Sequence, residues 1–169
     1  MPSNFEIAVK LLEYALLMEG DEYWERLMKL RRDGFILMSD LSKFRPRLIG
    51  SVWRGIVKPS SDIDVELDFT NPELVRHELI RNSYEILEEG EITVPKPLRQ
   101  GSLWKMKVRT KLGHEAEIIL KEHKWYINPP RCEIFGDVRK GLNLMELKVV
   151  LRKEPDKLFI PEEGCRDGD

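Results

Sequence analysis

Two aspartates at alternate positions, Asp62 and Asp64, follow a Gly-Ser pair, Gly50-Ser51, within one short stretch of the sequence. Residues two apart on a β-strand point to the same face, so the two carboxylates are expected to lie close together. Carboxylates in such a position repel each other, and a hard divalent cation such as Mg²⁺ relieves the repulsion. The spacing therefore indicates half of a metal site that also takes phosphate oxygens.

The Gly-Ser pair supplies the other half of this hypothesis. Glycine permits a sharp turn and a close approach of a ligand to the backbone. If Ser51 begins a helix, the first N–H groups of that helix point outward and attract an anion. Arg54 lies one turn further on and either contacts phosphate or is an ordinary surface charge. The alternative for the two aspartates is a half-buried strand with a solvated polar face.

Hydrophobic spacing and capping residues predict the elements that position this stretch. We expect helices over residues 4–19, 21–32 and 35–44, a short helix over 51–57, a longer one over 72–89 and a last one from about residue 138 to about residue 152. Strands are expected over 47–49, 63–69, 103–110 and 115–120. Pro95 and Pro97 predict that the stretch after the helix over 72–89 is an edge strand or a loop. The sum is a single α+β or α/β domain.

The stretch GSVWRGIVKPSSDIDV, which begins at Gly50, resembles the signature of the polymerase-β-like nucleotidyltransferase superfamily. That signature has Gly-Ser, often followed by x-x-Arg-Gly, then a variable turn and Ser-Asp-x-Asp. The matching residues are Gly50, Ser51, Arg54, Gly55, Ser61, Asp62 and Asp64. The stretch is most similar to minimal nucleotidyltransferases and to the catalytic domain of archaeal CCA-adding enzymes, and it covers a small part of the 169 residues.

The resemblance implies a domain organisation. Residues 46–152 would form a nucleotidyltransferase domain, a mixed β-sheet packed with helices, and residues 1–45 would form helices that precede it. The polar residues at the end of the sequence predict separately that residues 153–169 form a tail that is partly disordered.

The resemblance also implies a third carboxylate on a later strand of the same sheet. Glu117, followed by three apolar residues in GHEAEIIL, fits this position best, and Glu115 on the same strand face is the second choice. The family usually has Asp here, but Glu is one methylene longer and still offers oxygen ligands. The alternative for Glu117 is an exposed strand residue.

The activity implied is Mg²⁺-dependent transfer of a nucleoside monophosphate from a nucleoside triphosphate, such as ATP, to a hydroxyl, with release of pyrophosphate. Asp62, Asp64 and Glu117 would be catalytic and would hold two Mg²⁺ ions, with Mn²⁺ as a substitute. Gly50, Ser51, Arg54 and Ser61 would bind the nucleotide phosphates. The acceptor, whether RNA, protein or a small molecule, is left open, as is the base.

A second class of function also fits the resemblance. Minimal nucleotidyltransferases often pair with a small helical protein, so the chain is alternatively a non-catalytic or antitoxin-like module that binds such a partner. An exposed apolar patch on the N-terminal helices would favour this alternative.

Basic and aromatic residues outside the motif have two interpretations each. Lys105, Lys107 and Arg109 share a strand face that either tracks a nucleic-acid backbone or is simply solvated. Trp125 and Tyr126 either stack on a base or pack internally.

Composition narrows the class of protein. With 28 basic and 30 acidic residues the formal net charge is -2, so any binding of nucleic acid depends on a local patch. Cys132 and Cys165 lack the spacing of a zinc site or a disulfide framework. No stretch has the run of apolar residues that spans a membrane, and the N-terminus is unlike a signal peptide. We expect a cytoplasmic protein without membrane contact.

Overall fold

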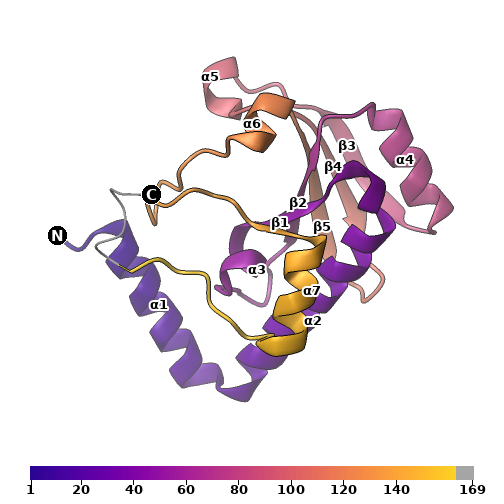
Figure 1. Cartoon of the computed structure of the whole chain (residues 1–169). Helices are drawn as coiled ribbons and strands as arrows, with labels where there is room; N and C mark the ends of the chain where they lie inside the picture. Colours follow the sequence, from indigo (N-terminus) through magenta and orange to yellow (C-terminus); the bar gives the residue numbers. More distant parts are fainter. Residues whose placement is uncertain (163–169) are drawn as a thin grey trace.

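The computed structural model describes residues 1–162, which form seven α-helices and one six-stranded sheet (Figure 1). The helices are α1 (Asn4–Glu19), α2 (Asp21–Asp40), α3 (Gly50–Arg54), α4 (Pro72–Arg81), α5 (Lys96–Arg99), α6 (His123–Ile127) and α7 (Leu144–Lys153), with a 3₁₀ turn over Ser42–Phe44. The strands are β1 (Arg47–Ile49), β2 (Ile63–Asp68), β3 (Glu85–Glu91), β4 (Ser102–Arg109), β5 (Glu115–Lys121) and β6 (Leu142–Asn143). Their order in the sheet is β3-β4-β5-β2-β1-β6.

The sheet is mixed, because β2 and β5 pair in parallel while every other neighbouring pair is antiparallel. Apolar side chains of β2 and β5 are fully buried on one face: Ile63, Val65, Leu67, Ala116, Ile118 and Leu120. Helices α2 and α7 lie side by side on the sheet (Figure 1). The alternate residues, among them Asp64 and Glu117, point to the opposite face. A mixed sheet packed with helices and preceded by N-terminal helices confirms the predicted fold class.

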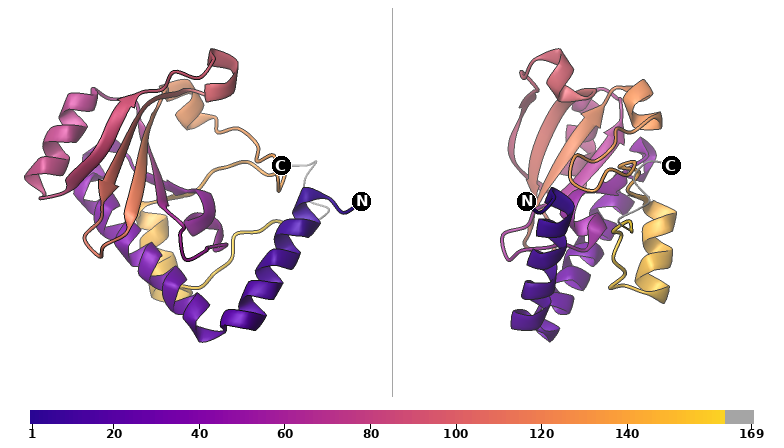
Figure 2. Two further views of the ribbon diagram at one scale, coloured as in Figure 1. Left: turned by 180° about the vertical axis from the view of Figure 1, so that it is seen from behind. Right: turned by 90° about the vertical axis from the view of Figure 1, so that its left-hand side faces the viewer.

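Helix α1 has the predicted bounds, with Ser3 and Glu6 forming a reciprocal capping box. It contacts α2 but diverges from it and stands apart from the sheet (Figure 2). Within residues 1–162, no helix is long and apolar enough to cross a membrane. The cytoplasmic location stays a prediction.

Helix α2 runs through Gly34, where the sequence predicted a break. A Cβ at Gly34 would lie 3.4 Å from Ile63 Cγ2 and 3.5 Å from Leu48 Cδ1. The glycine therefore lets the helix approach the sheet closely, and the packing gained there offsets its low helix propensity. Leu27, Leu30 and Leu37 of α2 belong to the same hydrophobic cluster as the sheet, so residues 1–45 share one core with the rest of the described chain.

The helix predicted over 72–89 is wrong beyond Arg81. Ser83 has a φ of 66°, a left-handed conformation that ends the helix. The following strand β3 is antiparallel to β4, with Glu85 opposite Arg109 and Glu88 opposite Lys107. Opposite charges at facing positions favour the pairing of two strands, which a Glu-rich stretch read by helix propensity alone does not reveal.

The last helix, α7, begins at Leu144 rather than near Val138, with Asn143 and Glu146 forming its capping box. The segment after α7, expected as a tail, packs on the body at least as far as residue 160. Leu158, Phe159 and Ile160 lie against the core, and Arg31 donates to the carbonyl oxygens of Pro155 and Lys157. The polar end, residues 163–169, lies outside the described residues.

Candidate active site

Gly50, Asp64 and Glu117 meet on the face of the sheet opposite α2 and α7. Ile49, the last residue of β1, is opposite Asp64 on β2, and Asp64 is in register with Glu117 on the parallel strand β5. Gly50 follows directly with a φ of 73°, and a Cβ there would lie 2.5 Å from Asp64 Oδ2. Glycine is therefore required for the turn and for the position of the Asp64 carboxylate.

Side chains of helix α2 hold this turn in place. The buried Arg31 side chain donates to the carbonyl oxygens of Val52 (3.0 Å) and Trp53 (2.9 Å) in α3. The Tyr23 hydroxyl donates to the Gly55 carbonyl oxygen at 2.6 Å. These bonds occupy carbonyl groups that a five-residue helix cannot bind itself. The N-terminal helices are thus part of the scaffold of the Gly-Ser turn.

Asp64 is held among other acids. Burial raises the pKa of Asp64 to about 7, and the charges of Glu117 and Asp62 and a hydrogen bond with Glu117 act in the same direction. The charge of Arg139 opposes them. Asp64 forms no ion pair with any Lys, Arg or His of residues 1–162. The three acids predicted from the sequence thus act on one another.

The three carboxylates offer the oxygen ligands of a metal site, but they do not yet converge on one point. Within residues 1–162, no three His, Cys, Asp or Glu side chains already converge so as to hold a metal ion. Asp64 and Glu117 instead lie opposite each other on the parallel strands β2 and β5, and the charge of Glu117 helps to raise the pKa of Asp64. Mg²⁺ takes one or two protein carboxylates and completes its shell with water and phosphate oxygens. The donor chemistry of Asp62, Asp64 and Glu117 therefore suits Mg²⁺ bound together with a phosphate ligand.

Glu117 and Glu115 have different surroundings. Glu117 lies beside Asp64, and its Oε1 is 3.2 Å from Lys105 Nζ. Glu115 lies nearer the start of β5 and pairs with Lys107 at 3.8 Å and Arg109 at 3.5 Å. Its position relative to Asp64 makes Glu117 the better candidate for the third acid. The basic row of β4 is occupied at least in part by these two glutamates.

Arg54 lines the cavity beside the Gly-Ser turn, but its guanidinium is already bound by other groups of the chain. Its guanidinium donates to both carboxylate oxygens of Asp137, at 2.7 and 2.6 Å, and to the Phe159 carbonyl oxygen at 3.1 Å. It also lies over the rings of Trp53 and Phe135, at 4.3 and 4.6 Å from their centres. Its side chain is only 6% exposed. These contacts tie α3 to the loop that contains Asp137, and the phosphate contact predicted for Arg54 stays a prediction.

Ser61 closes the turn before β2. Its backbone N–H donates to the Lys58 carbonyl oxygen at 3.0 Å, and its Oγ accepts from the Lys58 N–H at 2.7 Å. The hydroxyl hydrogen is not used in these bonds, so Ser61 can still donate to a ligand. Ser51 lies at the start of α3, next to Gly50.

A cavity of about 440 Å³ lies beside the Gly-Ser turn. Its polar wall includes Gly50, Ser51, Asp64 and Arg139, and its apolar wall includes Trp53 and Phe135. Arg139 was not among the site residues predicted from the sequence, because it lies in an irregular loop where no periodicity marks it. A charge pattern in the sequence does not reveal which cation of such a loop faces the acids.

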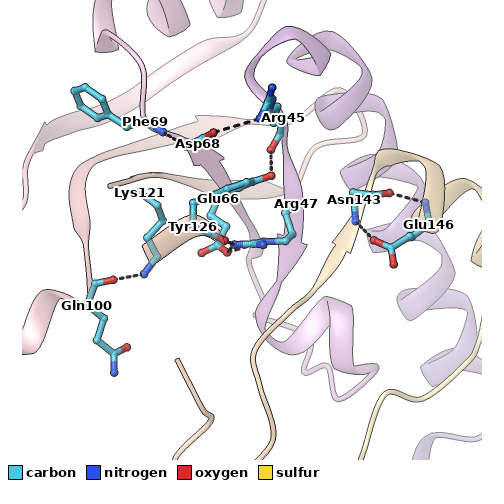
Figure 3. A network of polar contacts seen from close by, with 10 residues as sticks. All are labelled: Arg45, Arg47, Glu66, Asp68, Phe69, Gln100, Lys121, Tyr126, Asn143 and Glu146. Carbon is cyan, nitrogen blue, oxygen red and sulfur yellow. Dashed lines mark hydrogen bonds and ion pairs between the residues drawn. The ribbon is translucent and has the colours of Figure 1, made fainter. Parts of the chain in front are cut away.

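Beyond Asp64, the same face of the sheet carries a network of paired charges (Figure 3). Glu66 is buried and forms an ion pair with Arg47, whose guanidinium also donates to the Tyr126 carbonyl oxygen at 2.8 Å. The centre of the Tyr126 ring lies 4.1 Å from Cζ of that guanidinium, and the Tyr126 hydroxyl donates to the Arg45 carbonyl oxygen. Asp68 contacts Arg45 at 3.8 Å. Tyr126 is thus packed internally, one of its two predicted alternatives.

Comparisons with known proteins add little to this description. No family model matches the chain, and no curated protein matches its sequence. Among solved structures, the chain is similar to terminal uridylyl transferase 4 from Trypanosoma brucei with bound UTP and UpU, with a TM-score of 0.29 and 12% identity. The match covers 80% of this chain and 47% of that one, so this chain spans about half the length of that protein. A similarity at this level carries no inference about activity.

Proposed function

We propose that this protein is a Mg²⁺-dependent nucleotidyltransferase that moves a nucleoside monophosphate from a nucleoside triphosphate to a hydroxyl acceptor. The observation that supports it is the position of Asp64. Its carboxylate lies against the Gly50 turn on one side and against Glu117 on the other, and no cation of residues 1–162 forms an ion pair with it. A cluster of acids beside a cavity is the arrangement that a metal-bound phosphate neutralises.

In this proposal each residue has a defined task. Asp62, Asp64 and Glu117 hold Mg²⁺, which supplies charge neutralisation and lowers the pKa of a hydroxyl when bound. Gly50 and Ser51 let the triphosphate approach the backbone, and Ser61 offers a hydroxyl donor. The acceptor oxygen forms a bond to the α-phosphorus as the bond to pyrophosphate breaks, and the hydroxyl proton leaves to the carboxylate cluster. Positioning and electrostatics supply most of the rate.

The test is transfer of radioactive label from each α-labelled nucleoside triphosphate to RNA, protein or small hydroxyl compounds, with and without Mg²⁺. Asp64→Asn should reduce transfer by about a thousandfold or more, because it removes a carboxylate from the metal site. Asp68→Asn is the matched control, because Asp68 lies on the same face of β2 but contacts Arg45 and His123 instead of the cluster. We expect it to keep transfer within about threefold of the wild-type rate. Transfer that needs no divalent cation, or that survives Asp64→Asn, would contradict the proposal.

A second function is favoured by one observation on α1. Large apolar side chains are exposed along this helix, and they recur at helical spacing: Ile7, Leu11, Tyr14, Leu17 and Met18. Leu17 is 82% exposed. Such a face is typical of a surface that binds another protein, as expected for the module that pairs with a small helical protein.

The two functions respond to different variants. In a binding module, Leu11→Glu should abolish the complex with a purified helical partner, while Asp64→Asn leaves its affinity unchanged. In an enzyme, Asp64→Asn abolishes transfer and Leu11→Glu does not. Sedimentation and the label-transfer assay, run on the wild type and on both variants with and without the partner, distinguish the two functions.

A further inference from the structure

We propose that Arg139 is the side chain that binds the phosphate chain of the substrate in the cavity beside Asp64, and that Arg54 holds in place the loop that carries it. This inference rests on the proposed function, which requires an anionic ligand at that cavity. A phosphate that binds so close to three carboxylates needs a positively charged side chain beside it, and Arg139 would be that side chain.

Arg139 faces the site and has no competing contact. It lines the same cavity as Gly50, Ser51 and Asp64, and its charge acts on Asp64. Its guanidinium makes no hydrogen bond or ion pair to any side chain or backbone group of residues 1–162. A guanidinium offers five donors in a planar fork that matches phosphate oxygens, so this one is free to bind an anion.

The other cations near the acids are already engaged. Lys105 pairs with Glu117. Arg47 pairs with Glu66, and the buried Lys121 donates to the Gln100 carbonyl oxygen at 2.8 Å (Figure 3). Arg54 is bound at both ends of its guanidinium by Asp137. An anion at Arg54 would have to displace a buried ion pair, which is unfavourable.

The backbone around Arg139 is fixed on two sides. The Arg139 N–H donates to the Pro130 carbonyl oxygen at 3.0 Å. Gly141 has a φ of 62° and lies so close to β1 that a Cβ would clash with the Leu48 carbonyl oxygen. Asp137, two residues before Arg139, is held by Arg54. The Arg54–Asp137 pair therefore positions the loop, and Arg139 extends from it over the acids.

The first experiment measures the binding of inorganic tripolyphosphate and of a nucleoside triphosphate, each with Mg²⁺, to the full chain by calorimetry. Arg139→Met should weaken both by at least about tenfold, since it removes charge-assisted hydrogen bonds to phosphate. Arg139→Lys should recover part of the loss, because it restores the charge without the fork. Lys140→Met is the matched control, because Lys140 is the exposed neighbour, and we expect it to bind as the wild type does.

Asp137→Ala distinguishes between Arg54 and Arg139 as the residue that binds phosphate. If Arg54 were the phosphate ligand, releasing it from Asp137 would maintain or increase the affinity for tripolyphosphate. If Arg54 positions the Arg139 loop, the same change weakens binding. Thermal unfolding of each variant confirms that the chain is folded at the temperature of the assay.

Cys132 provides a second, direct readout because it lines the same cavity. Bound tripolyphosphate should slow alkylation of Cys132 in the wild type but not in Arg139→Met, as followed by peptide mass spectrometry. The inference is overturned if Arg139→Met binds tripolyphosphate within about twofold of the wild type. Binding of tripolyphosphate through Arg139 without any nucleotide transfer would contradict the proposed function and leave the anion site standing.

Discussion

Asp64 and Glu66 lie two residues apart on the same face of β2, yet only Glu66 forms an ion pair with a cation of residues 1–162. Glu66 is only 2% exposed and is neutralised by Arg47, which is itself held by Tyr126. Asp64 has other acids beside it and no ion pair with a cation of residues 1–162. The fold thus neutralises one carboxylate internally and leaves the other to a ligand. The following changes test that contrast.

The largest effect is expected from Glu66→Ala. It leaves the Arg47 guanidinium buried without its carboxylate, which lowers the free energy of unfolding by about 3 kcal/mol or more. Urea unfolding followed by circular dichroism measures this. The double change Arg47→Met with Glu66→Leu should recover much of the loss, because it removes both charges. A loss of under about 1 kcal/mol for Glu66→Ala would show that Glu66 is no better neutralised than Asp64.

Asp64→Asn should have the opposite sign and stabilise the protein without metal by about 2 kcal/mol at pH 8. This is less than the roughly 4 kcal/mol to which a rise of about three pKa units corresponds, because burying the Asn amide retains part of the desolvation cost. The ordinary pKa of 3.8 is raised to about 7 in the folded chain. The folded state therefore binds the proton more tightly, and the contribution of Asp64 to stability falls as pH rises from about 4 to about 7. The gain of the variant should be complete above pH 7 and absent below pH 4. Equal gains at pH 4 and pH 8 would contradict this.

Binding of Mg²⁺ should compete with the proton on Asp64. The apparent Mg²⁺ affinity should fall about tenfold for each pH unit below 7, and binding at pH 6 should release a proton. Calorimetry in two buffers of different ionisation enthalpy measures that release. Asp64→Asn should abolish it, and Asp68→Asn should keep it.

The smallest effect is expected within the paired network. Tyr126→Phe removes the hydroxyl that donates to the Arg45 carbonyl oxygen at 2.7 Å but keeps the ring over Arg47. The free energy of unfolding should fall by about 1 kcal/mol. The same denaturant measurement applies, and a loss as large as that of Glu66→Ala would mean that the hydroxyl, not the ion pair, stabilises this region.

The local parts of the site were predictable from sequence, and the long-range parts were not. Gly50, Ser51, Asp62 and Asp64 belong to one motif, and the resemblance implied Glu117 as the third acid, with Glu115 on the same strand face as the second choice. Whether β5 lies beside β2, and in which register, depends on side chains packed across the whole core. That register is what brings Glu117 to Asp64.

Two further features had no local signal at all. Arg54 matched the motif, but its partner Asp137 comes from a distant loop, so its buried ion pair was not predictable. The Glu-rich β3 was predicted as helix because propensity is local, whereas the opposite charges of β4 that favour a strand are not.

The parallel pairing of β2 with β5 also has a consequence for how the chain assembles. Strands β3, β4 and β5 follow one another in sequence, so they can pair early, whereas β2 must join them across the whole intervening segment. Long-range pairings form more slowly than local ones. We therefore expect the carboxylates of Asp64 and Glu117 to meet only in a late folding step, at which a divalent cation in the refolding buffer would first be able to act.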